Sequence, residues 1–301
     1  MVEAAARILA EAGVASPRPD ATALAAHALG LPRLELALAP AVPEGFAEEF
    51  AELVDRRRRR EPLQHILGST VFRYLTLRVE PGVFVPRPET EVVAQVAVDE
   101  AARLARTGIA PLVVDLCCGA GGIALSVGTE VPTSRVVAVD ASPEAVALTR
   151  HNGAHAVPQA PMTIRIEQGD VRDAALLADL DARVDVLVSN PPYIPPDAVP
   201  VDPEVRDHDP DLALYGGGAD GLEVPRAVIA AAARLLVPGG LLVMEHAEVQ
   251  GAAARADAEA TGAFEQIETR PDLTGRPRML VARRRGEPST PPQAGVRDSQ
   301  P

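Results

Sequence analysis

The stretch with the clearest chemical character is "VDVLVSNPPYIPPD", residues 184–197, where an apolar run ends in Asn190, Pro191, Pro192 and Tyr193. Proline has no backbone N–H, so this turn presents carbonyl oxygens and withholds backbone donors. Asn190 adds a side-chain carbonyl. A stiff, acceptor-rich loop of this kind suits a planar NH2 group held through both hydrogens, with the Tyr193 ring as a flat wall for stacking. The alternative is an ordinary proline-rich turn that binds nothing.

The chemistry that this loop favours is attack by an amide or exocyclic amine nitrogen on an activated carbon. The lone pair of such a nitrogen is delocalised, so acceptors that hold both N–H groups favour pyramidalisation and aim the lone pair. Positioning of this kind supplies about 7–11 kcal/mol of a barrier, and the same acceptors stabilise the developing positive charge. No base of ordinary strength is required before attack, because the alkylated cation loses its proton easily. We interpret Asn190, Pro191 and Tyr193 as catalytic and residues 190–193 as the acceptor-binding loop.

A glycine-rich turn, "VVDLCCGAGG" at residues 113–122, is the second candidate site. It has the order strand, acid, glycine-rich turn and helix, and Asp140 ends the next strand nineteen residues after Gly121. Glycines let the backbone approach a ligand closely, and an acid at the neighbouring strand end can bind ribose hydroxyls. Nicotinamide enzymes share this layout, and a purely structural turn in which Asp140 caps a helix would also produce it.

Two details favour S-adenosylmethionine as the ligand of this turn. Cys117 stands where the first glycine of a G-x-G-x-x-G motif would be, and Asp115 lies just before the turn. S-adenosylmethionine carries a sulfonium and an amino group, and carboxylates suit these cations better than they suit a pyrophosphate. The predicted cofactor-binding residues are Cys117, Cys118, Gly119, Ala120, Gly121, Asp140, Asp170, Val171 and Asn190.

Asp170 and Val171 follow the third strand of the pattern, in "IEQGDVRD". We expect Asp170 to accept a hydrogen bond from the adenine amino group and Val171 to pack on the ring. A plain turn aspartate is the alternative. The histidines show no ligand spacing, so no metal site is expected.

A sheet must bring these residues together. From residue 111 onward strands alternate with helices, which is typical of an α/β fold with a mostly parallel sheet covered on both faces. Strands are expected at 111–116, 135–140, 162–170, 185–190 and 241–246, with two antiparallel strands within 264–284. In an open parallel sheet, ligands bind beyond the carboxyl ends of the strands, where both motifs lie.

The chain before the sheet has a different pattern. Residues 1–60 are Ala-rich, and we expect a domain of three or so short helices, with Asp20 as an N-cap. In the connector at 61–90, alternating apolar residues predict a β-hairpin. Residues 91–285 form the predicted catalytic domain, and the polar, proline-rich tail at 286–301 is expected to be disordered.

Composition limits the functional classes. The formal net charge is −13, whereas a duplex-DNA binder usually carries a basic face. The two cysteines, Cys117 and Cys118, are adjacent and cannot form an ordinary disulfide, which suits a reducing compartment. The N-terminus does not resemble a signal peptide, and no apolar run reaches the ~18 residues of a membrane span. We expect a cytoplasmic protein that binds neither a membrane nor, stably, nucleic acid.

The sequence resembles the protein-glutamine N5-methyltransferases of peptide-chain release factors, the HemK/PrmC family. The resemblance covers about residues 5–285. The segments that carry it are "PLQHILG", "VFVPRPETE", "VSNPPYIP", "EVRDHDPDLALYGG", "DGLEVPRAVI", "LVPGGLLVMEH" and "DLTGRPRMLVARR". The Asn-Pro-Pro-Tyr motif alone is shared with adenine and other amino methyltransferases, whereas "PRPETE" and "EVRDHDPDLALYGG" are far more particular.

The resemblance implies a seven-stranded, Rossmann-like class I methyltransferase sheet with a small N-terminal helical domain and a hairpin connector. It implies that residues 117–121 and Asp140 hold S-adenosylmethionine. It also implies that residues 190–193 hold the glutamine of the Gly-Gly-Gln loop of a release factor, a partner that the helical domain helps to dock. The chain departs from the family at "CCGAG", where Gly-Thr-Gly-x-Gly is usual, and at "MEHAEVQG", where Glu-x-Gly-x-x-Gln-Gly is usual. A paralogue with another protein substrate is therefore an alternative.

Three other functions stay open. An amino methyltransferase acting on nucleic acid would need a basic recognition surface, which the net charge of −13 argues against. A non-catalytic regulatory protein that binds S-adenosylmethionine would tolerate loss of residues 190–193, which are intact. A nicotinamide oxidoreductase would need a second catalytic constellation, which the sequence lacks.

Three further segments have two interpretations each. Residues 56–60 are five arginines, which either end a helix in solvent or form a docking patch for an acidic partner or ribosomal RNA, so ribosome association is an open alternative. Arg87, Glu89 and Glu91 in "PRPETE" are either helix-dipole partners or supports of the cofactor site. The long polar segment 203–221 is either a plain loop or a cover for the acceptor pocket.

Overall fold

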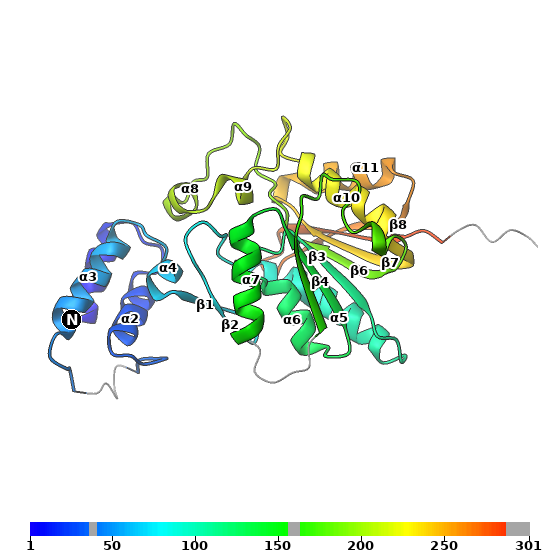
Figure 1. The fold of residues 1–301 in the computed structure, drawn as a ribbon. Helices are drawn as coiled ribbons and strands as arrows, with labels where there is room; N and C mark the ends of the chain where they lie inside the picture. Colours follow the sequence, from blue (N-terminus) through cyan, green and yellow to red (C-terminus); the bar gives the residue numbers. More distant parts are fainter. Residues whose placement is uncertain (36–40, 156–162, 287–301) are drawn as a thin grey trace, which may run out of the picture.

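The computed structural model describes residues 1–35, 41–155 and 163–286, and the predicted disorder of the tail from residue 287 lies outside the described residues. The N-terminal part is a small bundle of helices to one side of the sheet (Figure 1). Its helices are α1 Val2–Glu11, α2 Pro17–Ala28, α3 Phe46–Arg58 and α4 Leu63–Leu67. Phe46, Phe50 and Ile66 join buried Ala and Leu residues in an apolar core that belongs to this bundle alone.

One detail of α2 differs from the expectation. Asp20 is not an N-cap, because the helix begins at Pro17 and Asp20 lies inside it. Proline suits the first helical position, where its missing N–H would have had no partner. The carboxylate of Asp20 instead accepts a hydrogen bond from Arg57 of α3 at 2.8 Å.

The connector forms the predicted hairpin, in which β1 Ser69–Phe72 and β2 Leu75–Arg78 pair antiparallel. Asn152, on α7 Pro143–His155, binds both the N–H and the carbonyl of Arg78 and fastens the hairpin to the sheet domain. Helix α5 Thr90–Ala105 follows. The division into domains at residues 60, 90 and 285 stays a prediction.

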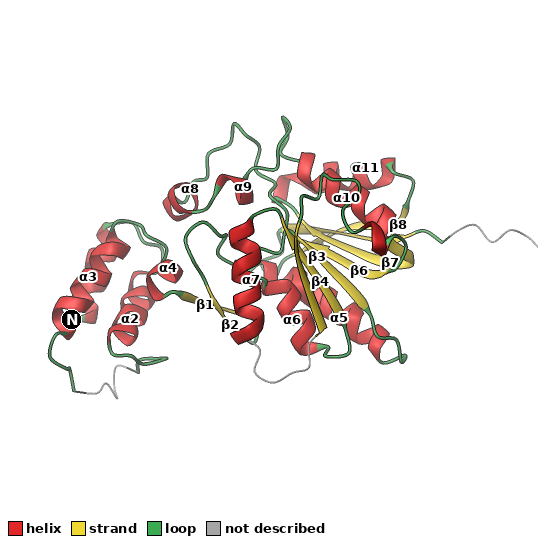
Figure 2. Cartoon of the chain, viewed as in Figure 1, coloured by secondary structure: helices red, strands yellow, loops and turns green. Residues whose placement is uncertain are grey.

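A seven-stranded sheet with helices on both faces forms the rest of the described chain (Figure 2). The strand order is β5-β4-β3-β6-β7-β9-β8, with the first five strands parallel and β9 antiparallel to both neighbours. The strands are β3 Leu112–Leu116, β4 Arg135–Asp140, β5 Thr163–Gln168, β6 Val184–Ser189, β7 Leu236–Glu245, β8 Phe264–Pro271 and β9 Pro277–Arg284. The expected α/β class with a seven-stranded sheet is confirmed.

Successive side chains of a strand point to opposite faces of the sheet, so the strands contribute to two apolar cores, one on each face. On one face Val113, Val186 and Val243 pack with α5 and with α6 Gly122–Glu130. On the other face, Val114 and Leu242 are among the strand residues that pack with α10 Glu223–Leu235 and α11 Gly251–Ala260. Both faces are therefore covered, and the edge at the carboxyl ends of the strands is where a ligand can enter.

Two short helices occupy the segment that the sequence predicts as a long polar loop. They are α8 Pro203–His208 and α9 Asp211–Leu214. Helices of six and four residues leave no periodic pattern that a sequence reading could detect. Like every other helix in the described ranges, they are too short or too polar to cross a bilayer.

Candidate active site

The sheet register places the two predicted loops side by side. Strands β3 and β6 pair so that Leu116 lies opposite Ser189, and the next residues, Cys117 and Asn190, therefore leave the sheet at neighbouring points. The Ser189 hydroxyl donates to the Leu116 carbonyl at 2.7 Å and fixes the two strand ends together. Strand β4, on the other side of β3, ends in Asp140. The chain reverses its direction across the sheet between β3 and β6, which is where open α/β sheets bind ligands.

A cavity of about 730 Å³ opens over this edge. That volume lies within the range of about 300–1,000 Å³ that is typical of small-molecule sites. Predicted site residues in its wall are Cys117, Cys118, Gly119, Ala120, Asp140, Asp170, Val171, Asn190, Pro191, Pro192 and Tyr193. Gly121 is the predicted site residue that does not line the cavity. The cavity also reaches Ser16, Arg57 and Arg60 of the helical bundle. The glycine-rich turn, the acceptor-binding loop and the N-terminal bundle therefore all line one cavity.

The glycine-rich turn has a left-handed backbone at three residues, with φ of 61° at Cys117, 55° at Gly119 and 87° at Gly121. For a residue with a side chain, this conformation costs roughly 1–2 kcal/mol, so Cys117 holds a strained backbone that glycine would adopt freely. A side chain on Gly121 would come within 3.0 Å of Cγ2 of Thr149. Gly121 is therefore needed for close packing of the turn on α7.

Asp140 fixes the backbone of the glycine-rich turn in the cavity wall. One carboxylate oxygen accepts the N–H of Gly119 at 2.8 Å, and the other accepts the N–H of Ser142 at 2.9 Å. Burial raises the pKa of Asp140, and the backbone donors of Ser142 and Gly119 oppose that rise. Each oxygen keeps a second lone pair, so the carboxylate can still accept hydrogen bonds from ribose hydroxyls.

Asp170 lines the cavity but already has a partner. Its carboxylate accepts hydrogen bonds from the Arg172 guanidinium at 2.6 Å and from the Arg172 N–H at 2.9 Å. The hydrogen bond from the guanidinium is the main reason why the pKa of Asp170 is lowered. The pair is about half exposed and so contributes little stability. Because Arg172 donates two hydrogen bonds to each oxygen of Asp170, it would have to be released before Asp170 could bind an adenine amino group. Val171 is buried in the cavity wall.

Asp115 does not line the cavity. It is fully buried in β3, where one oxygen accepts the N–H of Ala124 at 2.9 Å and Oδ1 has no donor within the described residues. Burial raises its pKa to about 8, and the charge of Asp140 adds to the rise. A nearby cation would favour the ionised form. Asp115 therefore supports the turn from behind through Ala124, and Asp140 is the acid of this pair that faces the cavity.

Two glycines fix the backbone of the acceptor-binding loop, residues 190–193. A side chain on Gly216 would lie 2.6 Å from the Pro192 carbonyl oxygen, and one on Gly221 would lie 2.4 Å from that of Tyr193. Side chains do not tolerate such distances, so the segment "LYGGGADG" can press on the loop only because these positions are glycine. The loop is held from outside and is not merely stiffened by its prolines.

A buried carboxylate lies behind the acceptor-binding loop. Asn190 Nδ2 donates to Thr90 Oγ1 at 3.1 Å, and the Thr90 hydroxyl donates to Glu245 Oε2 at 2.8 Å. The Tyr193 hydroxyl donates to the other oxygen of Glu245 at 3.3 Å. Burial raises the pKa of Glu245 to about 7, while the hydrogen bond from Thr90 and the charge of Arg278 lower it. The carboxylate of Glu245 thus contacts Tyr193 directly and Asn190 through the Thr90 hydroxyl.

Three residues around the acceptor-binding loop, Thr90, Glu245 and Gln250, were not predicted from the sequence. Glu245 ends β7, whose Met244 pairs with Ser189 of β6, so the strand-end rule that identified Asp140 could also have found Glu245. Gln250 donates from Nε2 to the Tyr193 carbonyl at 2.8 Å. Its only signal was its place in "MEHAEVQG", a segment in which we noted only the departure from the family pattern.

The residues of "PRPETE" make different contacts. Glu89 lines the cavity, and Arg87 donates to the carboxylate of Asp209 at 2.5 Å. The carbonyl of Glu91 accepts a hydrogen bond from Arg73. Thr90 is the member that reaches the acceptor-binding loop.

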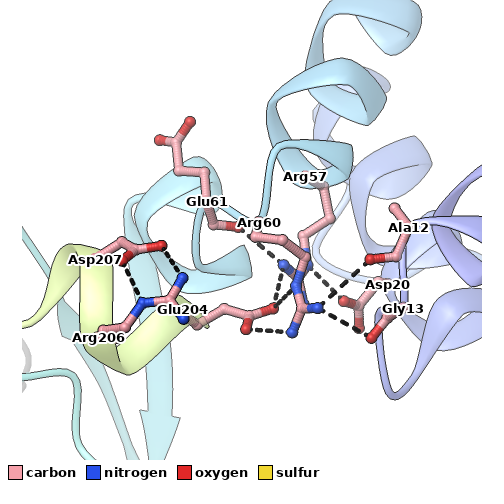
Figure 3. A network of polar contacts seen from close by, with 9 residues as sticks. All are labelled: Ala12, Gly13, Asp20, Arg57, Arg60, Glu61, Glu204, Arg206 and Asp207. Atoms are coloured by element: carbon pink, nitrogen blue, oxygen red, sulfur yellow. Dashed lines mark hydrogen bonds and ion pairs between the residues drawn. The ribbon is translucent and has the colours of Figure 1, made fainter. Parts of the chain in front are cut away.

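Arg57 and Arg60, two of the five arginines at residues 56–60, neither end the helix in solvent nor form a free docking patch, because both bind carboxylates of this chain (Figure 3). Arg57, which is 6% exposed, donates to Asp20 and, at 2.7 Å, to Glu204 of α8. Arg60 donates to both oxygens of Glu204, at 2.7 and 2.5 Å. The remaining arginines pair locally, Arg56 with Glu61, and Arg58 and Arg59 with Asp55. The run therefore joins the helical bundle to α8.

The roof segment, residues 203–214, carries α8 and α9 and is fastened at two carboxylates. Burial alone would raise the pKa of Glu204, but the hydrogen bonds from Arg60 and Arg57 outweigh it and hold that pKa at about 2. Farther along, Asp209 pairs with Arg87. Several residues of the segment line the cavity.

Comparisons with known proteins agree with this arrangement. Residues 1–68 match the PrmC N-terminal domain, and residues 76–201 match the methyltransferase small domain. The release factor glutamine methyltransferase of Bifidobacterium longum is 47% identical over 283 residues, which cover 91% of this chain and 95% of that protein. The protein of the same name from Streptomyces coelicolor is 47% identical, with coverages of 92% and 94%. The one from Mycobacterium tuberculosis strain H37Rv is 39% identical, with coverages of 95% and 91%.

Two solved structures share the fold. The T. thermophilus 16S rRNA N2 G1207 methyltransferase, in complex with AdoMet and guanosine, aligns with a TM-score of 0.50 and 22% identity over 72% of this chain and 50% of that chain. A methyltransferase from Pyrococcus furiosus aligns with a TM-score of 0.51 and 14% identity over 77% of this chain and 100% of that chain. These two similarities concern the fold alone and confirm the class I methyltransferase sheet. Because the sequence relatives are 39–47% identical over nearly the whole length, the chain belongs to the family of release factor glutamine methyltransferases.

Proposed function

We propose that this protein is an enzyme that transfers a methyl group from S-adenosylmethionine to the side-chain amide nitrogen of a glutamine in a peptide-chain release factor. The observation that carries the proposal is the shared cavity. The glycine-rich turn and the acceptor-binding loop leave neighbouring strands and line one enclosure, in a chain of this family. A nucleoside donor and a planar amide can lie side by side there.

The cofactor side of the cavity fits S-adenosylmethionine, which supplies an electrophilic methyl carbon when bound. The backbone of residues 117–120 would approach it, Asp140 would accept the ribose hydroxyls, and Val171 with Asp170 would hold the adenine. Asp140 places a carboxyl group in the cavity wall beside the turn, which suits a cationic ligand. Gly121 supports this surface through its packing on α7.

The acceptor side presents oxygen atoms. Asn190 Nδ2 faces Thr90, so its Oδ1 is left for a ligand, and the Pro191 carbonyl adds a second acceptor. These two oxygens would hold both N–H groups of the glutamine amide, with the Tyr193 ring as the flat wall beside it. The lone pair is then aimed at the methyl carbon, and the same oxygens stabilise the positive charge that develops on nitrogen.

We further propose that the acceptor is the glutamine of a Gly-Gly-Gln loop and that the helical bundle helps to dock the release factor. The cavity reaches Ser16, Arg57 and Arg60 of that bundle, so a loop that enters it would touch both parts of the chain. The enzyme would then act in the cytoplasm, where translation takes place. Contact with the ribosome would come through the release factor.

Labelled S-adenosylmethionine and purified release factors test this function directly. We expect one methyl group on a glutamine side chain of the release factor, located by mass spectrometry of the digested product. Label on nucleic acid alone would overturn the assignment of the substrate. Label on a different protein would contradict the release factor and support a paralogue with the same chemistry.

Asp140→Asn tests the cofactor side. We expect the Kd for S-adenosylmethionine to rise about tenfold or more, because hydrogen bonds from ribose to a charged carboxylate are lost or weakened. Isothermal titration of the cofactor measures it. Asp179→Asn, at an exposed acid that pairs with Arg165 away from the cavity, is the matched control. An unchanged Kd in Asp140→Asn would contradict the assigned role.

A further inference from the structure

Thr90, whose hydroxyl faces Asn190, is itself bound to a buried carboxylate, that of Glu245, which takes no part in the contacts proposed above. Thr90 and Glu245 are separated by 155 residues, yet the Thr90 hydroxyl donates to Glu245 Oε2 at 2.8 Å. Asn190 Nδ2 donates to the same Thr90 oxygen at 3.1 Å. Thr90 is 5% exposed and Glu245 is 2% exposed, so water competes little for these hydrogen bonds.

The direction of the two hydrogen bonds follows from the number of available protons. An ionised carboxylate only accepts, and a threonine hydroxyl carries a single proton. Thr90 gives that proton to Glu245 and so presents only lone pairs to Asn190. The Asn190 amide must therefore turn its NH2 group toward Thr90, which leaves its carbonyl oxygen for the cavity that this residue lines.

We propose that Glu245, acting through Thr90, is the positioning residue that sets which end of the Asn190 amide faces the acceptor. The inference rests on the proposed function, because an acceptor amide that offers two N–H groups needs an oxygen there. With its amide reversed, Asn190 would present N–H groups to N–H groups, and the contact would be lost. A side chain that touches neither substrate nor cofactor thereby controls the chemistry of one that does.

The second oxygen of Glu245 binds Tyr193, at the other end of the acceptor-binding loop. It accepts the Tyr193 hydroxyl at 3.3 Å, while Gln250 holds the Tyr193 carbonyl. The ring and the backbone of Tyr193 are both fixed in this way. One carboxylate thus couples the orientation of the oxygen acceptor to the position of the stacking wall.

Protonation of Glu245 should reverse the direction of the Thr90 hydrogen bonds and with it the orientation of the Asn190 amide. Burial raises the pKa of Glu245 to about 7; Thr90, Arg278 and Tyr193 lower it, and the charge of Glu89 adds to the rise. Below that pH the protonated carboxyl can itself donate to Thr90, whose own proton is then free to point at Asn190. The productive orientation is therefore expected to develop as the pH rises through about 7.

An NMR titration tests the orientation without any turnover. The chain has two asparagines, Asn190 and Asn152, so selective ¹⁵N-asparagine labelling gives two side-chain NH2 groups to follow. We expect the Asn190 signal to titrate with a midpoint near pH 7 in the wild type and to lose this titration in Glu245→Gln. Asn152, which donates to the carbonyls of Arg78 and Ala120, is an internal control. An Asn190 signal that ignores pH, or a titration that survives Glu245→Gln, would overturn the proposal.

Substitutions of Thr90 test the relay itself. Thr90→Val removes the hydroxyl at nearly constant shape, so hydrogen exchange of the Asn190 NH2 should rise about fivefold. We expect kcat to fall about 10- to 100-fold while the Kd for S-adenosylmethionine is kept, and Thr90→Ser should restore most of the turnover. Thr107→Val removes an exposed hydroxyl just beyond the end of the same helix and is the matched control. Wild-type exchange and kcat in Thr90→Val would refute the relay.

The two kinds of measurement separate this inference from the proposed function. If the wild-type protein transfers no methyl group to a release factor, the proposed function fails, and the titration and exchange of Asn190 still decide whether Glu245 and Thr90 orient it. If methyl transfer occurs and Thr90→Val leaves it unchanged, only the positioning role fails.

Discussion

Asn190→Ala is expected to lower kcat for methyl transfer by ~10²-fold or more while cofactor binding is retained. The substitution removes the side-chain oxygen that would hold one N–H of the acceptor amide. It also removes a charge-stabilising acceptor from the point where positive charge develops. The backbone of the loop should survive, because Gly216 and Gly221 hold it from outside. Initial rates with a release factor, together with the Kd for S-adenosylmethionine, measure the two effects.

Gln95→Ala provides the control for this substitution. Gln95 is an exposed amide on α5 whose Nε2 donates to Asp99, and it lies outside the cavity wall. It should leave both kcat and cofactor affinity as in the wild type. Full turnover in Asn190→Ala would contradict the role given to the loop, as would a loss of turnover that merely follows a loss of cofactor binding.

Arg57→Met is expected to lower the free energy of unfolding by about 3–5 kcal/mol, the usual effect of removing one partner from a buried ion pair. Methionine fills a similar volume but leaves the carboxylates of Asp20 and Glu204 without the donor that lies between them. Denaturant unfolding followed by circular dichroism measures the loss. Arg59→Met is the matched control, because Arg59 is exposed and its ion pair with Asp55 lies on the surface, and no measurable change is expected there.

The pH dependence of stability gives an independent check on the same cluster. The pKa of Glu204 is lowered from 4.5 to about 2, so its contribution is complete above pH 4.5 and is lost as the pH falls toward 2. Removal of Arg57 should raise that pKa and reduce the pH dependence in this window. A variant that unfolds like the wild type at every pH would show that Arg57 does not stabilise the joint.

The sheet and the two loops were predictable because their signals are local. Each strand is a short apolar run, and Asp140 and Asn190 stand directly after such runs. A parallel sheet collects its strand ends at one edge. Cys117 and Asn190 are 73 positions apart, yet they and Asp140 could be placed near each other before their contacts were known. The register of β3 with β6 then sets the two loops side by side.

The supporting contacts were not predictable, because they join residues that no local pattern connects. Thr90 and Glu245 are 155 positions apart, and Arg57 and Glu204 are 147 positions apart. A run of five arginines looks like a solvated surface in the sequence. Only tertiary packing shows that Arg57 is buried between two carboxylates. The partner of Asp170 was missed for a different reason, since Arg172 lies two positions away and competes with the expected ligand.

The ion pairs of Glu204 with Arg57 and Arg60 should limit how freely the N-terminal bundle can be exchanged between homologues. The roof segment belongs to the catalytic half of the chain, but its position is set by the N-terminal bundle. A chimera that takes its bundle from another protein would need matching cations at these two places. Without them, Glu204 would be left without its partners, and the mouth of the acceptor pocket would lose its shape although every residue inside it is native.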